Sequence, residues 1–302
     1  MKILISGSTG LLGRAIAFEN KKYNYELSGI YFPEKKYESL ELFESAYFGD
    51  ITNYNLLLKI IAKLKPDAII HAASNANVDW VEKNKEEAYK NNYEGLKNIF
   101  NIASTEGIRF IHISSNAVYD GDNPPYSEIS ERKPFNYYGK LKVLEEDYII
   151  SKSNDYTIIR PILMYGWNDP LERENPFTWQ LRLQKNNSEI KLVDDIFCNP
   201  LLANDCAKVI LELIRKKITG IFNVAGSEIL SRYEFGLKIA EITGYDISKI
   251  IPVPNSAFPE IAPRPKNTSF DISKIQNILN IKMSNVKQGI GYLTEKIVVA
   301  EQ

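Results

Sequence analysis

The chain contains few of the residues that bind metals or form disulfide frameworks. Among its 302 residues are two cysteines, Cys198 and Cys206, and two histidines, His71 and His112. The two cysteines fit neither a disulfide framework nor a zinc site. Each histidine lies in an apolar, strand-like run, so we expect structural roles for both. The sequence therefore predicts no metal site, and its cysteine usage indicates a reducing, cytoplasmic location.

An excess of one charge and long apolar runs are also missing. Lys and Arg number 37 against 38 Asp and Glu, a net charge of -1. This balance predicts neither a nucleic acid nor a membrane as partner. No apolar run approaches the roughly 18 residues of a transmembrane helix, and the N-terminus lacks a signal-peptide pattern. The length of 302 residues predicts one large α/β unit or two closely joined domains, and a hydrophobic content of 44% is ordinary for a globular protein.

What the chain does have is a glycine-rich turn close to its start. A buried strand is predicted over 2–6, and a helix is predicted to run from the turn to about Asn20. Such a turn offers backbone N–H groups and the positive end of the helix dipole to a diphosphate. The alternative is a plain strand-to-helix turn. The position favours a cofactor site, formed by Gly7, Thr9, Gly10, Leu11, Leu12, Gly13 and Arg14.

The second predicted strand, 26–32, ends without an acidic residue. An acid there would bind the ribose 2′-hydroxyl of NAD. Tyr31 and Phe32 occupy this end instead, and Lys35 and Lys36 follow. These cations and Arg14 favour the 2′-phosphate of NADP(H), although the lysines could equally be solvated loop charges. NADP(H) is therefore the favoured cofactor, and NAD(H) stays open.

Two further strands are predicted to reach the same site. The strand at 46–51 ends in Asp50 and Ile51, which could contact the adenine amino group and ring. Asp50 could alternatively cap the next helix, a role that Asn53 can also fill. The strand at 66–74 ends in small residues that let a cofactor approach the backbone: Ala72, Ala73 and Ser74.

A long helix is predicted over 85–106, with Asn91, Asn92 and Asn98 along it. Asparagine is unfavourable inside helices. We therefore expect at least one of the three to bind a polar partner inside the protein, the alternative being that all are solvated.

The strand predicted over 109–115 ends in two hydroxyls, Ser114 and Ser115, and a loop leads on to Tyr138 and Lys142. Residues four apart share one face of a helix. A phenol has a pKa of about 10, and a nearby ammonium lowers it. Because ligands bind at the carboxyl ends of parallel strands, we expect Ser115, Tyr138 and Lys142 to converge on one cofactor. The alternative is a chance pair on a solvated helix.

With these motifs the chain resembles the extended short-chain dehydrogenase/reductase family, and within it the dTDP-4-dehydrorhamnose reductase group. The family motifs that match are Gly7, Gly10 and Gly13, Asp50-Ile51, His71-Ala72-Ala73, Asn92, Ser114-Ser115, and Tyr138 with Lys142. The group's signatures appear at Val78-Asp79, 114–121, 193–195, 222–228, 231–235 and 264–268. The chain departs from the group at Asn75, Asn116-Ala117, Leu163 and 196–201, positions that lie near the sugar in the family.

The resemblance implies a Rossmann-type, doubly wound parallel sheet with a smaller C-terminal substrate lobe. Residues 1–165, with a returning segment near 200–224, would bind the cofactor, among them Asn92, Tyr138 and Lys142. Residues 166–302 would mainly bind the substrate. Substrate contacts are expected at Val78, Asn116 and Arg264, and Arg264 could alternatively be a surface residue braced by prolines.

The implied reaction is NAD(P)H-dependent reduction of the keto group of a nucleotide-linked 4-keto-6-deoxy sugar. Tyr138 would donate a proton, Ser115 would hydrogen-bond the same oxygen, and Lys142 would hold the nicotinamide ribose and lower the Tyr138 pKa. Alternatives are a nucleotide-sugar 4-epimerase with tightly bound NAD, a 4,6-dehydratase, which would need an acidic pair where Asn116-Ala117 stand, and a non-catalytic regulatory subunit. A homodimer is left open.

Overall fold

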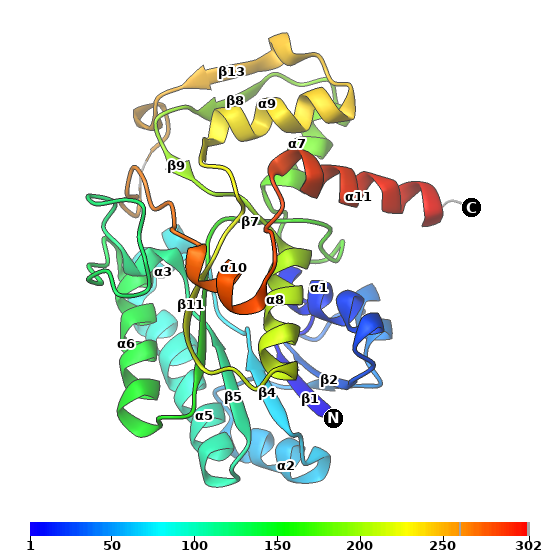
Figure 1. The fold of residues 1–302 in the computed structure, drawn as a ribbon, viewed down its shortest axis with the longest axis vertical. Coiled ribbons are helices and arrows are strands. Elements are labelled where there is room, and N and C mark those ends of the chain that lie inside the picture. The colour runs from blue at the N-terminus through cyan, green and yellow to red at the C-terminus, as the bar shows by residue number, and fades with distance from the viewer. Residues whose placement is uncertain (260, 301–302) are drawn as a thin grey trace.

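The centre of the protein is a seven-stranded sheet. The computed structural model describes residues 1–259 and 261–300, with backbone alone for 296–300. The strand order is β11-β6-β5-β4-β1-β2-β3, and every neighbouring pair is parallel (Figure 1). The strands are β1 (Lys2–Ser6), β2 (Glu26–Tyr31), β3 (Ser45–Phe48), β4 (Ala68–His71), β5 (Arg109–Ile113), β6 (Thr157–Pro161) and β11 (Gly220–Val224). This order confirms the predicted doubly wound Rossmann-type sheet.

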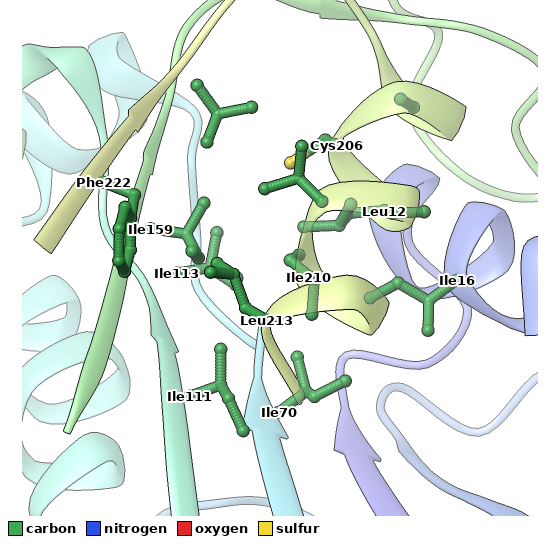
Figure 2. Close-up of a cluster of buried hydrophobic side chains, with 14 of the residues drawn as sticks. Leu12, Ile16, Ile70, Ile111, Ile113, Ile159, Cys206, Ile210, Leu213 and Phe222 are labelled. Carbon is green, nitrogen blue, oxygen red and sulfur yellow. The ribbon is translucent and has the colours of Figure 1, made fainter. Parts of the chain in front are cut away.

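Helices cover both faces of the sheet because alternate residues of each buried strand point to opposite sides. On one face, helices α1 (Leu11–Glu19) and α8 (Ala203–Arg215) pack over Ile70 and Ile111. Figure 2 shows Leu12 and Ile16 of α1 beside Ile210 of α8 in this cluster. On the other face lie α2 (Tyr54–Leu64), α5 (Gly95–Thr105) and α6 (Tyr137–Lys152), over the neighbouring strand residues.

A smaller lobe is built from the second half of the chain. A parallel pair, β8 (Ile190–Val193) and β13 (Ile250–Val253), carries helix α9 (Arg232–Thr243), with α7 (Pro176–Lys185) and α11 (Val286–Ala300) beside it (Figure 1). The other elements are α3 (Val78–Lys83), α4 (Lys85–Ala88), α10 (Ser273–Leu279), β7 (Met164–Tyr165), β9 (Phe197–Cys198), β10 (Leu201–Leu202) and β12 (Leu230–Ser231). Residues 260, 301 and 302 of the predicted 166–302 lobe lie outside the described residues.

Two predicted elements differ in the structure. The third strand ends at Phe48, so Asp50 lies in the turn that precedes α2 rather than on the strand. The helix predicted over 85–106 is interrupted, because a π-helical segment, Tyr89–Glu94, separates α4 from α5. Within residues 1–259 and 261–300, no helix is both long and apolar enough to cross a bilayer.

Candidate functional site

The glycine-rich turn joins β1 to α1 at the switch point of the sheet, between β1 and β4. Gly7 has a φ of +74°, and a Cβ there would lie 2.8 Å from the nitrogen of Ala73. A Cβ on Gly13 would lie 2.5 Å from the Gly7 carbonyl oxygen. Only glycine satisfies both positions. Gly10 stands at the N-cap of α1, where no side chain caps the helix, so the first-turn N–H groups face outward for an anion.

A cavity of about 350 Å³ opens above this turn. Nine of the residues predicted to bind the cofactor line it, namely Gly7, Thr9, Gly10, Asp50, Ile51, Ala72, Ala73, Ser74 and Asn92. The predicted Leu12 does not: its side chain is 5% exposed and belongs to the core beneath the turn (Figure 2). Leu11 also packs against that core. Asn53 caps α2, accepting from Leu56 N, while the Asp50 carboxylate accepts from Thr52 N at 2.8 Å.

Two of the three asparagines in the predicted helix, Asn92 and Asn98, bind backbone groups inside the protein, and Asn92 lies in the π-helical segment. Asn92 is 1% exposed, and its side chain accepts from Asn75 N at 2.8 Å and donates to Asn75 O at 3.1 Å. A π turn adds a residue to a helix and is frequent at functional sites. Here it accompanies an inward amide that fixes the loop after β4, which forms one wall of the cavity. Asn98 also binds inward, donating to the carbonyls of Ile51 and Thr52.

An acidic residue from the second half of the chain also lines the cavity. Glu172 lies in the loop that follows β7, and its carboxylate accepts a hydrogen bond from the Thr9 hydroxyl at 2.7 Å. The same carboxylate helps to raise the pKa of Tyr37, after burial, and the Tyr37 ring lies 6.1 Å from that of Tyr31 at the end of β2. Sequence reasoning missed Glu172 because nothing near it in the chain marks it as a ligand.

The predicted cation patch for a 2′-phosphate is only partly assembled. Arg14 donates to the Trp167 carbonyl at 2.8 Å. Burial lowers the pKa of Arg14, and the nearby carboxylates of Asp169 and Glu38 oppose that fall. The other two cations, Lys35 and Lys36, are exposed. Arg14 is therefore held by the loop that carries Glu172.

Ser115, Tyr138 and Lys142 come together at the carboxyl end of β5. Asn136 caps α6 by accepting from Gly139 N at 2.9 Å, which places Tyr138 in the first turn. The three side chains are 9%, 7% and 2% exposed, in that order, and Lys142 Nζ lies 5.7 Å from the Tyr138 ring centre. The Ser115 hydroxyl accepts from Ala117 N at 3.1 Å. A hydroxyl, a phenol and an ammonium thus share one enclosed site.

The pKa of Tyr138 is raised, in contrast to the predicted lowering. Burial is the largest cause, and Lys142 opposes it as predicted, with help from the Ser115 hydroxyl. Glu145, which the sequence analysis did not single out, acts in the raising direction. It accepts from Lys142 Nζ at 2.8 Å. Burial of the phenol therefore outweighs the opposing effect of the Lys142 ammonium, which Glu145 partly balances.

Each of the three predicted substrate residues contacts another part of the chain. Arg264 pairs with Asp79 at 2.8 Å, so its guanidinium already faces a carboxylate. Asn116 donates to Thr268 Oγ1 at 2.7 Å. Val78 packs in the cluster that contains Tyr138. These contacts join the segment after β13 to the catalytic end of the sheet.

A second cavity, of about 480 Å³, lies between α7, β8 and α9. Its walls include three cations, Arg173, Lys191 and Arg232, and two aromatic side chains, Trp179 and Phe258. Arg173 also acts electrostatically on Asp79, the partner of Arg264, and helps to lower the pKa of that carboxyl. Cations and aromatic rings in one cavity suit an anionic ligand that carries a flat ring. No local pattern in the sequence marks this cavity, because its residues come from four separate segments.

Comparison with known proteins shows which chains this one resembles. Methionine adenosyltransferase 2 subunit beta of Pongo abelii is 30% identical over 285 residues, which cover 92% of this chain and 82% of that protein. The dTDP-4-dehydrorhamnose reductase of Aggregatibacter actinomycetemcomitans is 29% identical over 302 residues, covering 96% and 97%. The crystal structure of dTDP-4-dehydrorhamnose reductase from Bacillus anthracis, in complex with NADP, has a TM-score of 0.86 and 26% identity, covering 98% and 99%.

The family model described as "RmlD substrate binding domain" matches residues 1–298, nearly the whole chain. The predicted resemblance is confirmed by this match together with the reductase relatives. The chain belongs to the RmlD substrate binding domain family.

Proposed function

We propose that the protein reduces the keto group of a nucleotide-linked 4-keto-6-deoxy sugar with a reduced nicotinamide dinucleotide. The observation that carries the proposal is the enclosure of Ser115, Tyr138 and Lys142 at the end of β5, beside the strand whose end lines the dinucleotide cavity. The relatives named dTDP-4-dehydrorhamnose reductase, which match over almost their full length, support this substrate class.

The cavity above the glycine turn fits a dinucleotide on two observations. A Cβ at Gly7 would clash with the backbone of Ala72 and Ala73, which line the cavity beside it. The Ser74 hydroxyl lines the cavity, is buried, and has no hydrogen-bond partner among the described residues. Gly7, Thr9 and Gly10 would hold the diphosphate, and Asp50 and Ile51 the adenine. Asn92 would brace the wall after β4, and Tyr138 and Lys142 would hold the nicotinamide ribose.

The choice between the two nicotinamide dinucleotides is a separate part of the proposal. NADP(H) is supported by the exposed lysines, Lys35 and Lys36, beyond the end of β2 and by the NADP complex of the Bacillus anthracis relative. NAD(H) is the alternative, because Arg14 is held by the Trp167 carbonyl and Glu172 brings a negative charge to the cavity. Titration of the protein with each reduced dinucleotide, followed by its fluorescence, decides between them.

The chain's own residues account for the proton that the reduction needs. When bound, the reduced nicotinamide supplies a hydride to the keto carbon. Tyr138, protonated and enclosed, donates its proton to the keto oxygen as negative charge develops there. Ser115 donates a hydrogen bond to the same oxygen. Burial of the three side chains strengthens these interactions by excluding water.

We propose that residues 1–165, with the returning segment near 200–224, form the cofactor domain, and that 166–302 mainly bind the sugar nucleotide. The second cavity supports this division, because Arg173 and Arg232 suit a diphosphate and Trp179 suits a base. Val78, Asn116 and Arg264 would line the path between the two cavities. The sugar, the nucleotide and a homodimeric state remain proposals, and the buried free cysteines suit the proposed reducing, cytoplasmic setting.

A second candidate function is that of a non-catalytic subunit of another enzyme. It is supported by the similarity to a protein named methionine adenosyltransferase 2 subunit beta. In that case a dinucleotide bound in the cavity would stabilise or regulate the protein, and Tyr138 would transfer no proton to a substrate.

Reduced nicotinamide absorbance, recorded with a panel of nucleotide 4-keto-6-deoxy sugars, separates these functions. We expect loss of reduced cofactor in a one-to-one ratio with the sugar product. Tyr138→Phe should reduce kcat by at least about 100-fold, the contribution of a general acid, and leave cofactor binding intact. Interconversion of sugars without cofactor loss would indicate an epimerase. The absence of any turnover would favour the subunit function.

A further inference from the structure

Helix α6 buries a carboxylate against the predicted catalytic lysine. Tyr138, Lys142 and Glu145 follow one another at intervals of four and three residues, so they share one face of the helix. Glu145 is 1% exposed and Lys142 2%. Lys142 Nζ donates to Glu145 Oε2 at 2.8 Å and to the Ile113 carbonyl at 3.2 Å. The ammonium is therefore fixed at the end of β5 by two acceptors.

The groups that face this pair from the neighbouring strands β4 and β5 are uncharged at pH 7. From β5, His112 Nε2 lies 3.1 Å from Glu145 Oε2. From β4, His71 stacks on His112 with ring centres 5.8 Å apart. Burial lowers the pKa of both histidines, so both rings are neutral at pH 7. Ser115, at the end of β5, carries no charge.

One further acid lies next to Glu145 on the helix. Glu146 also acts on Lys142, but it is paired with the buried Arg160 at 2.6 Å and with Arg132 at 3.1 Å, and Asp147 balances Arg132 at 2.6 Å. The remaining charges that act on Tyr138 are those of Lys142, which favours its phenolate, and Glu145, which opposes that effect.

Glu145 is ionised in this position. Burial would raise its pKa, but Lys142 and His112 hold the pKa at about 2. A buried carboxylate without such partners would be strongly destabilising. A buried pair of this kind holds its members in one geometry and cancels much of the field that either would exert alone.

We propose that Glu145 is a positioning residue that neutralises Lys142 and keeps Tyr138 protonated, ready to donate its proton to a ketone. This inference rests on the proposed reductase function. In the reaction, a C–H bond forms by hydride addition to the keto carbon, the C=O π bond breaks, and the oxygen takes the Tyr138 proton. The reduced cofactor is oxidised, and a solvent proton restores the phenol. Alcohol oxidation would instead start from the phenolate, which Lys142 stabilises less strongly when Glu145 pairs with it.

The ionisation of Tyr138 can be measured without any substrate. Carbon-13 labelled tyrosine in the intact protein gives a ring signal for Tyr138, identified by its absence in Tyr138→Phe. We expect Glu145→Gln to lower the pH at which this signal titrates by about one unit or more, because Lys142 then acts without its counter-ion. Lys152→Gln, which removes an exposed charge from the last turn of the same helix, should leave the titration unchanged. An unchanged titration in Glu145→Gln would overturn the proposal.

A double variant keeps the test informative if Glu145→Gln does not fold. Lys142→Met with Glu145→Met removes both charges, and the proposal predicts a Tyr138 titration at or above the wild-type pH. Titration well below it would refute charge cancellation. If the wild type reduces a sugar, the rate in Glu145→Gln should also begin to fall at a lower pH than in the wild type. If it reduces none, the proposed function fails while the titration still tests Glu145.

Discussion

The cavity above the glycine turn, here called the cofactor cavity, and the second cavity, between α7, β8 and α9, are lined by different kinds of group. The cofactor cavity is shaped by backbone and small side chains, and at Gly7 and Gly13 an added Cβ would meet backbone atoms within 2.8 Å. The second cavity is lined by long side chains, and Arg173 and Lys191 are exposed. Backbone cannot move aside cheaply, whereas an exposed side chain can be replaced. Changes to the backbone cradle of the first cavity should therefore cause large losses of cofactor binding, whereas changes to side chains at either cavity should cause graded changes in affinity.

The largest effect is expected for Gly7→Ala. The new methyl group would press on Ala73, and the φ of +74° is unfavourable for alanine. We expect dinucleotide affinity to fall by about 100-fold, the scale for a misplacement near 1 Å. Fluorescence titration with the reduced cofactor measures this fall.

Gly107→Ala is the matched control for Gly7→Ala. Gly107 has a φ of +65°, but among the described residues no heavy atom beyond its chain neighbours lies within 4 Å of its added Cβ. It should cost about 1–2 kcal/mol of stability and leave cofactor binding unchanged. Equal loss of binding in both variants would show that backbone strain, and not the cradle, controls the site.

An intermediate effect is expected for Arg264. If its guanidinium binds the nucleotide diphosphate, Arg264→Ala should raise the KM for the sugar nucleotide about tenfold, the scale of one hydrogen bond to a charged group. The Kd for the cofactor should not change. Asp79→Ala, which releases Arg264 from its 2.8 Å ion pair, should lower KM. A rise in KM for both variants would instead assign the pair a purely structural role, since either variant then disrupts the same contact between the lobes.

The smallest effect is expected for Glu172→Gln. Removal of a negative charge from the cofactor cavity should tighten dinucleotide binding by about two- to fivefold, as for a partly exposed charge pair. The gain should be larger for NADPH, which carries one more phosphate. Calorimetric titration measures it, with Glu174→Gln as control, because Glu174 lies on the same loop and pairs with Arg182 outside the cofactor cavity. Weaker binding in Glu172→Gln would show that the carboxylate is itself a ligand, as it would be for ribose hydroxyls.

The sequence could predict those parts of the site whose residues form a local pattern along the chain. The glycine turn and the strand ends at Ala72 and Ser115 are local patterns, since each residue follows a strand by a fixed number of positions. They predicted the sheet correctly, and nine of the residues predicted to bind the cofactor line one cavity. Glu172 contacts Thr9 across 163 positions, and the second cavity draws on four segments, so no local pattern marks either.

The prediction of a lowered Tyr138 pKa was wrong because that pKa depends on packing, which no local pattern shows. The Tyr138–Lys142 spacing is visible in the sequence, but the burial of the pair and the inward direction of Glu145 are properties of the packed helix. The π segment likewise depends on the bond between Asn92 and Asn75 and not on helix propensity alone.

The most direct test of the reductase proposal follows the hydride itself. The wild-type protein would be incubated with a nucleotide 4-keto-6-deoxy sugar and a reduced cofactor. The cofactor would carry deuterium on the face of the nicotinamide ring from which hydride is transferred. Mass spectrometry would then measure the mass of the product sugar. The account predicts one deuterium per product sugar and an equal loss of label from the cofactor, with neither seen in Tyr138→Phe. Sugar that is converted without label, or a full panel of sugars left unchanged, would contradict it.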